Sequence, residues 1–192
     1  ESQALVAAVL VQFQRAMVLG ARPGWLAIHP LAEGLDSKVN PAFYARRQQH
    51  QVFEASTAME LPAPGVAAGL AAFQGDTHWY FLGVRRQGDG AEVFLEKKAG
   101  GDVEVVAHQA IAGAQRLTLH VDGNQGAYGF GFDAGDGKGV QWLVRDADGT
   151  ILSTDVAGGF VGATLGPFAR DEREQVGHEA RDEREQVGHE AR

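Results

Sequence analysis

The sequence predicts an all-β fold, an antiparallel sandwich or barrel, and three observations support this class. Between residues 51 and 168, apolar side chains recur with a period of two rather than 3.6, which is typical of strands with one face on a core. Glycine or Asp-Gly lies in most of the links, and 26 glycines against 6 prolines favour many turns. No convincing amphipathic helix separates the strand-like segments, so a parallel α/β fold, which needs crossover helices, is not expected.

The N-terminal part of the chain is compatible with two structures. Residues 4–19 fit a helix or, equally, a strand followed by a loop. The apolar run at residues 4–11 is far shorter than the roughly 20 residues that cross a bilayer, so no membrane-spanning helix is expected. We treat residues 1–21 as an N-terminal segment separate from the sandwich, which is expected to cover residues 22–170.

The first strand of the alternating series covers residues 53–61, where apolar and polar side chains take turns along the chain. Pro62 and Pro64 end it, because proline cannot donate a ladder hydrogen bond.

A second alternating pair follows at residues 116–121 and 128–132, and the dipeptide Asp122-Gly123 is expected to form the turn between them. Five further strands are expected at residues 79–85, 92–97, 103–107, 140–144 and 162–168.

The C-terminus consists of one 11-residue sequence that is present twice, at residues 171–181 and 182–192. Each copy holds four acids and two arginines, and with a single valine and a single alanine it cannot bury an apolar stripe. We therefore expect residues 171–192 to form a charged tail, as a solvated helix or a disordered segment. His178 and His189 in this repeat are not expected to bind a metal.

Composition excludes several classes of function. A formal net charge of −8 argues against a nucleic-acid or anionic-membrane partner, because both require a basic face. The absence of cysteine excludes disulfides and thiolate metal sites, although it does not fix the compartment. Neutral sugars remain compatible with this composition.

Catalytic and metal-binding motifs give no positive signal. There is no Gly-x-Ser-x-Gly, no phosphate-binding loop and no His-Glu-x-x-His. The best groups of oxygen ligands are Asp133 with Asp136 and Asp146 with Asp148, but neither continues as a calcium-binding loop. Turn formation is the favoured role for these carboxylates, with a structural calcium as the alternative, and no other cofactor is expected.

Aromatic residues and one histidine remain as binding candidates. Trp25, Trp79 and Trp142 could stack on sugar rings, although the strand context of Trp79 and Trp142 favours packing in the core. His50 is expected to be structural, with contact to a partner domain or ligand as the alternative. Phe160 follows two glycines in a thin loop that could project a large ring, although the residues alone favour a core position for it.

A resemblance to a known family rests on four segments in order along the chain. They are Arg-Arg-Gln-Gln-His-Gln-Val-Phe (46–53), Ala-Gly-Leu (68–70), Ser-Thr-Asp-Val-Ala-Gly-Gly-Phe (153–160) and Gly-Ala-Thr-Leu-Gly (162–166). Across about residues 22–169 the chain resembles the C-terminal concanavalin A-like β-sandwich domain of glycoside hydrolase family 43 β-xylosidases and arabinofuranosidases. The resemblance implies a jelly-roll-like antiparallel sandwich.

The same resemblance implies a function without catalysis. The chain would be an accessory domain that buttresses a catalytic five-bladed propeller, and Phe160 would help close the sugar pocket of that propeller. The parent enzyme would release terminal xylose or arabinose from xylo-oligosaccharides or arabinosides, while this chain alone would hydrolyse nothing. A homo-oligomer is compatible with the family, and a cytoplasmic location is expected.

Two other functions stay open at this point. An independent carbohydrate-binding module would hold polysaccharide through exposed rings such as Trp79. A small glycanase would need two opposed carboxylates, for which Glu54 and Glu60 are the candidates.

The sequence also departs from the family pattern at both ends, because it lacks a final aromatic-rich strand and an N-terminal strand with tryptophan. These losses are expected to open a sheet edge, unless residues 4–19 cover it.

Overall fold

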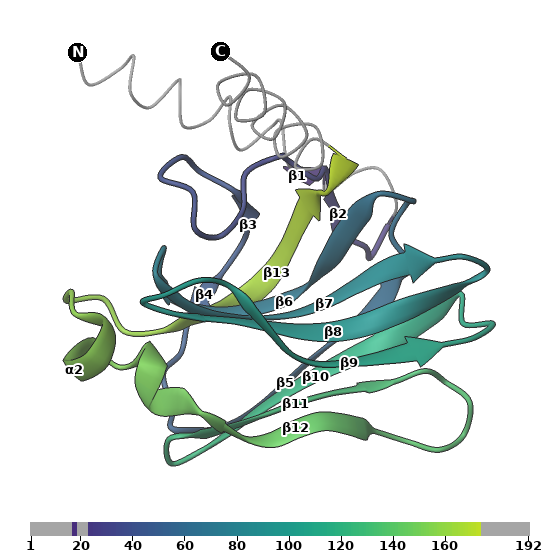
Figure 1. Ribbon diagram of the computed structural model, residues 1–192. Coiled ribbons are helices and arrows are strands. Elements are labelled where there is room, and N and C mark those ends of the chain that lie inside the picture. The colour runs from purple at the N-terminus through teal and green to yellow at the C-terminus, as the bar shows by residue number, and fades with distance from the viewer. Residues whose placement is uncertain (1–16, 19–22, 174–192) are drawn as a thin grey trace, which may run out of the picture.

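The computed structural model describes residues 17–18 and 23–173, and these form a sandwich of antiparallel strands (Figure 1). The expected all-β class is therefore confirmed. Most of the expected N-terminal helix or strand at residues 4–19, and most of the duplicated tail with His178 and His189, lie outside the described residues. The described part of the chain contains no helix long and apolar enough to cross a membrane.

The larger sheet has seven strands, with β3-β13-β6-β7-β8-β9 as neighbours and β4 also paired with β13. These strands are β3 (Ala42–Phe43), β4 (Arg46–Arg47), β6 (Val66–Gly75), β7 (His78–Gln87), β8 (Gly90–Ala99), β9 (Glu104–Ile111) and β13 (Thr164–Asp171). Both β3 and β4 pair with one side of β13, while β6 pairs with its other side.

The smaller sheet has four strands in the order β12-β11-β10-β5. Its strands are β5 (Val52–Glu60), β10 (Arg116–Asn124), β11 (Ala127–Asp133) and β12 (Gln141–Asp148). A separate two-stranded ribbon joins β1 (Met17–Val18) to β2 (Ala27–Ile28). Two short helices, η1 (Gly149–Leu152) and α2 (Thr154–Ala157), connect β12 to β13.

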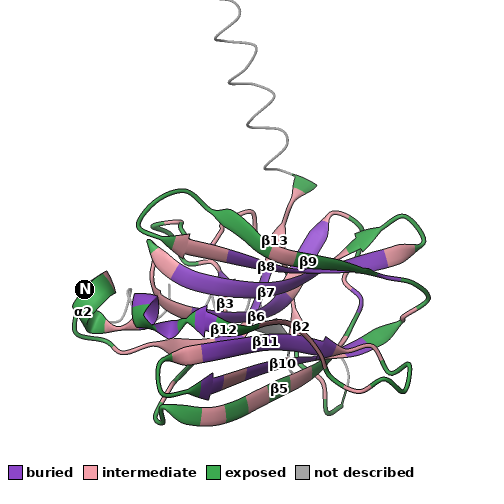
Figure 2. Ribbon diagram, turned by 60° about the horizontal axis from the view of Figure 1, so that its bottom comes forward, coloured by how far each residue is buried: buried purple, intermediate pink, exposed green. Residues whose placement is uncertain are grey.

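The main core lies between the two sheets. Leu117, Leu119 and Val121 of β10 pack there, together with Phe130 and Phe132 of β11. The alternation expected from sequence is thus confirmed for both strands. Figure 2 shows that β5 alternates between exposed and intermediate residues, because it is the edge strand of its sheet and covers the core from one side only.

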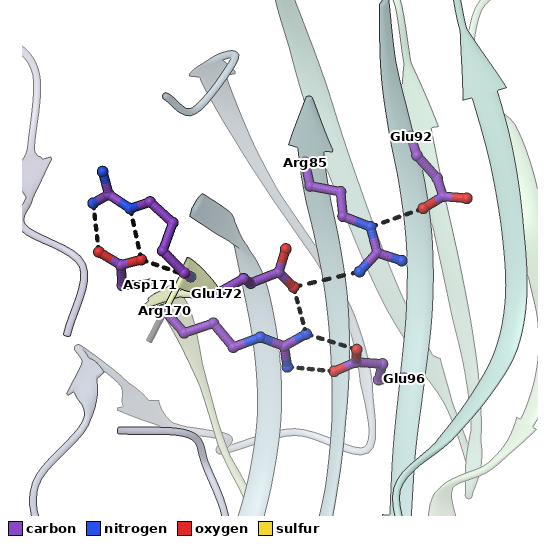
Figure 3. A network of polar contacts seen from close by, with 7 residues as sticks. Arg85, Glu92, Glu96, Arg170, Asp171 and Glu172 are labelled. Atoms are coloured by element: carbon purple, nitrogen blue, oxygen red, sulfur yellow. Dashed lines mark hydrogen bonds and ion pairs between the residues drawn. The ribbon is translucent and has the colours of Figure 1, made fainter. Parts of the chain in front are cut away.

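A second apolar cluster lies on the other face of the larger sheet. It contains Leu35, Ala67, Ala71, Trp79, Phe81, Phe94 and Phe168. Next to it, Arg170 of β13 donates two hydrogen bonds to Glu96 of β8, at 2.6 and 2.7 Å, and a third to Glu172 at 2.9 Å (Figure 3). Glu172 also pairs with Arg85, which in turn binds Glu92, so the network ties β13 to β7 and β8.

Two sequence predictions about turns are wrong. Asp122-Gly123 lies inside β10, and the turn is formed by Gln125 and Gly126, whose positive φ values of 49° and 100° suit a two-residue hairpin. Gly123 has a packing role instead, because a Cβ there would lie 2.2 Å from the ring of Phe53. Likewise residues 146–148 end strand β12 rather than form a turn, although Asp148 then caps η1.

Candidate docking site at the Phe160 loop

Phe160 stands on a loop between α2 and β13 and is fully exposed, with 100% of its surface open to solvent. Gly158 and Gly159 precede it with φ values of 74° and 77°, a backbone region that favours glycine. The two glycines end α2 and direct the chain outward. The core position that the residues alone favoured for Phe160 is therefore wrong, whereas a projecting ring was favoured only by the family resemblance. Figure 1 shows α2 and the following loop at the left end of the sandwich.

The loop is anchored on both sides of Phe160. On the N-terminal side, Ser153 Oγ accepts a hydrogen bond from the Val156 amide at 3.3 Å and so caps α2. Gln74 Nε2 donates to the Gly158 carbonyl at 3.3 Å, which ties the loop to the β6–β7 turn. On the C-terminal side, Thr164 Oγ1 donates to the Phe73 carbonyl at 3.1 Å. The exposed ring therefore stands on a fixed base.

The segment Arg46–Arg47 lies directly beside this loop. In β4, Arg47 is the register partner of Thr164, and the Gln48 amide donates to the Ala163 carbonyl at 2.9 Å. The guanidinium of Arg47 lies against Gly162, where an added Cβ would sit 3.4 Å from Arg47 Nη2. Two segments that are separated by more than 100 residues in the sequence thus meet at one end of the sandwich.

Gln48 connects the same site to the core. The Tyr128 hydroxyl of β11 donates a short hydrogen bond to Gln48 Oε1. Burial raises the pKa of Tyr128 and outweighs the hydrogen bond to Gln48, which acts to lower it. The phenol therefore stays protonated at neutral pH and remains a donor that holds residue 48 in place.

The surface around Phe160 is apolar and basic. Val156 in α2 and Val161 in the loop are exposed large apolar side chains. Val52, the first residue of β5, is a third exposed apolar side chain. Arg46 and Arg47 are both exposed. His50, which was expected to be structural, is exposed too, and its carbonyl accepts a hydrogen bond from Gln48 Nε2 at 2.9 Å.

The tryptophans are placed differently from one another. Trp79 is 2% exposed and belongs to the second apolar cluster, so its core role is confirmed and it offers no face to a sugar. Trp142, expected in the core, is instead half-buried on the outer face of the smaller sheet. Its ring lies over Gly129 and Gly131, and the Arg145 guanidinium stacks 4.5 Å from the ring centroid. A β-bulge in the pairing of β11 with β12 accompanies the position of Trp142 on the outer face instead of the core face.

Trp25, the third tryptophan, is half-buried, and the Arg116 guanidinium stacks 4.7 Å from its ring centroid.

The carboxylates do not form a hydrolytic pair. Glu54 and Glu60 lie six residues apart on one edge strand, so their backbones are about 20 Å apart, whereas glycosidases need about 5–9.5 Å between carboxyl groups. Glu60 also pairs with Arg116 at 3.3 Å. The glycanase assignment of these two residues is therefore wrong.

Three of the four aspartates considered as oxygen ligands bind local backbone amides, whereas Asp146 lies within strand β12. Asp133, Asp136 and Asp148 each accept a hydrogen bond from the backbone amide two residues further on, at 2.8, 3.1 and 2.9 Å. Across residues 17–18 and 23–173, no group of three or more histidines or acids is arranged to hold a metal ion.

The chain is similar in sequence to one protein family. A family model described as "Beta xylosidase C-terminal Concanavalin A-like domain" matches residues 12–181. No curated protein sequence matched the chain.

Several solved structures are similar to the chain. A GH43_12 protein retrieved from a capybara gut metagenome is 25% identical with a TM-score of 0.75, over 82% of this chain and 30% of that protein. A xylan beta-1,4-xylosidase from Bacillus halodurans C-125 is 23% identical with a TM-score of 0.72, over 82% and 31%. GH43B of a Bacteroides ovatus xyloglucan locus is 21% identical with a TM-score of 0.74, over 83% and 31%. The chain thus spans about a third of the length of these proteins.

Proposed function

The chain belongs to the family of concanavalin A-like C-terminal domains of β-xylosidases, and from this premise we propose that it is a non-catalytic accessory domain of a larger glycosidase. In this proposal the domain buttresses the catalytic propeller, and Phe160 forms part of the wall of the sugar pocket on that propeller. The substrate is a xylo-oligosaccharide or an arabinoside, which the carboxylates of the propeller hydrolyse.

The observation that carries the proposal is the full exposure of Phe160 on an anchored loop. A phenylalanine side chain gains about 1.5–3 kcal/mol when it is fully buried, so a ring left in water holds unused binding energy. The loop has already lost much of its conformational freedom, so docking the ring requires little further ordering. We infer that the Phe160 ring packs against the surface of a second protein domain.

A wall residue of this kind acts on the reaction without moving a proton. Apolar contact with the sugar ring and exclusion of water raise the effective strength of the interactions between the propeller's carboxylates and the substrate. Contacts that a neighbouring domain makes with the substrate can in this way stabilise the transition state in the catalytic pocket. The wide separation of Glu54 and Glu60 agrees with a role that supplies no acid or base.

The test uses the polypeptide that carries this chain together with its catalytic domain. If docking buries the whole Phe160 ring, Phe160→Ala is expected to cost about 2 kcal/mol, which lowers kcat/KM for an aryl xyloside about 30-fold. Val105→Ala is the matched control, because Val105 is an exposed apolar residue on the distant strand β9. An equal kcat/KM for the Phe160→Ala variant and the wild type would contradict the pocket-wall role.

The isolated chain supplies the second arm of the test. Incubated with a chromogenic xyloside, it is expected to release no product, and calorimetric titration with xylo-oligosaccharides is expected to give no heat. Turnover by the chain alone would refute the accessory role. Saturable binding without turnover would instead favour an independent carbohydrate-binding module.

A further inference from the structure

The arginines of the chain divide into paired and unpaired groups. Within residues 17–18 and 23–173, ion pairs with carboxylates are formed by Arg85, Arg116, Arg145, Arg170 and Arg173. Arg86 donates to the Pro62 carbonyl instead, at 2.8 Å. Arg46 contacts only the amide side chain of Gln49, at 3.5 Å, and none of the ion pairs of this part of the chain includes Arg47. Among residues 17–18 and 23–173, these two neighbouring arginines thus have no carboxylate partner, on a chain of net charge −8.

One of these two cations, Arg47, lies beside the loop that carries the exposed ring. Arg47 rests against Gly162, two residues after Phe160, and β4 is held to the start of β13 by backbone pairing. Asp155 is the one acid among residues 153–162, and it forms none of the ion pairs found in the described residues. The Phe160 loop therefore has one positive charge, that of Arg47, beside Gly162 and one negative charge, that of Asp155, on α2.

Docking of the loop has a consequence for Arg47. If Phe160 becomes buried against another surface, the Arg47 guanidinium, which lies against the same loop, is at least partly removed from water. An ion that is desolvated without a partner costs several kcal/mol, so the facing surface must supply a compensating acceptor. A carboxylate is the acceptor that matches a guanidinium in charge and geometry. A pocket built around catalytic carboxylates also creates a negative field at its rim.

We propose that Arg47 binds a carboxylate on the glycosidase domain, and that the surface of that domain facing residues 46–47 and 158–162 is acidic. This inference rests on the proposed function and adds the chemistry of the partner surface. The Phe160 ring supplies apolar contact, while Arg47 fixes the orientation of the two domains. Arg47 acts here as a positioning residue.

Hydrogen exchange of residues 153–163 tests this inference, measured in the intact parent polypeptide and in this chain alone. In the parent, the loop is expected to exchange more slowly than in the isolated chain. Arg47→Gln is expected to remove about tenfold or more of this protection, and Arg47→Lys, which keeps the charge, to restore part of it. Arg86→Gln is the matched control, since Arg86 lies near the opposite end of β7 from the β6–β7 turn.

The outcomes separate the two proposals. Equal exchange of the wild-type loop in the parent and in the isolated chain would overturn the proposed function itself. A protected loop that Arg47→Gln leaves unchanged would overturn only the acidic partner surface. If Arg47→Gln fails to fold in isolation, wild-type protection is measured from about 0.1 M to about 1 M salt, over which the Debye length falls from about 10 Å to about 3 Å. Protection that falls with salt supports the inference, and protection independent of salt overturns it.

Discussion

Removal of the Glu96 carboxylate is expected to destabilise the domain by about 3 kcal/mol, the low end of the range for breaking a buried ion pair. The side chains of Arg170 and Glu96 are only 12% and 7% exposed, and two short hydrogen bonds join them (Figure 3). We choose the low end because Arg170 keeps Glu172 as a partner in the variant. Burial acts to lower the pKa of Arg170, but its bonds to Glu96 and Glu172 outweigh this and raise it.

A double-mutant cycle separates the ion pair from general packing. Glu96→Leu and Arg170→Met are each expected to lower the free energy of unfolding by about 3 kcal/mol or more, because each leaves a buried charge without its main partner. The double variant is expected to lose less than either single variant, since leucine and methionine suit the adjacent rings of Phe81 and Phe94. Equilibrium unfolding in urea measures all four proteins.

The refuting result is additivity. If the effects of the two single changes add to within about 0.5 kcal/mol, the residues do not interact as the geometry requires. Such a result would also remove the argument that this network anchors the C-terminal end of β13, the strand whose first residues support the Phe160 loop.

Three further outcomes follow from the structure. Trp79→Ala is expected to cost about 3–5 kcal/mol of stability because the ring is fully buried, and a loss below 1 kcal/mol in urea unfolding would contradict that packing. Phe160→Ala is expected to leave the unfolding midpoint of the isolated chain unchanged, since the ring touches solvent only, so a clear shift by calorimetry would contradict its exposure. Hydrogen bonds from Arg173 lower the pKa of Asp171 to about 2, so this carboxylate is expected to stabilise the fold above its ordinary pKa near 4 and to lose that effect as pH falls toward 2. In an NMR titration Arg173→Ala should return the Asp171 midpoint to its usual range, and an unchanged midpoint would refute the assignment.

The sequence predicted β10 and β11, which have one buried face, and also β7 and β8, which are buried on both faces. In β10 and β11 each apolar residue points at the core between the sheets, and the alternation is visible in the chain. Strand β6 was not among the expected strands, because it lies inside the larger sheet with residues buried on both faces and is rich in alanine and glycine. The sequence of β6 therefore lacks the alternation of apolar and polar residues that indicates a strand.

The turn after β10 shows why a local motif can mislead. Asp-Gly is a strong hairpin signal, yet Gly123 is required where the Phe53 ring crosses the backbone from the neighbouring strand. That contact joins residues 70 positions apart, so no local pattern reveals it. The turn falls on Gln125, the one described non-glycine residue with a positive φ.

The candidate site was predictable only in part. The residues alone favoured a core position for Phe160, and only the family resemblance favoured the projecting ring, which is fully exposed in the structure. The position of Arg47 beside it depends on the pairing of β4 with β13, a long-range contact that the sequence does not encode locally. Trp142 was misplaced because a bulge in β12 interrupts the alternation on which its core assignment rested.

Site-specific photo-crosslinking from position 160 tests the central claim most directly. With p-benzoylphenylalanine in place of Phe160 in the parent polypeptide, the proposed role requires a crosslink to the catalytic domain at the rim of its sugar pocket. Bound xylo-oligosaccharide is expected to change the yield of that crosslink. If irradiation gives no link to the catalytic domain, or only links far from its carboxylates, Phe160 does not close the pocket.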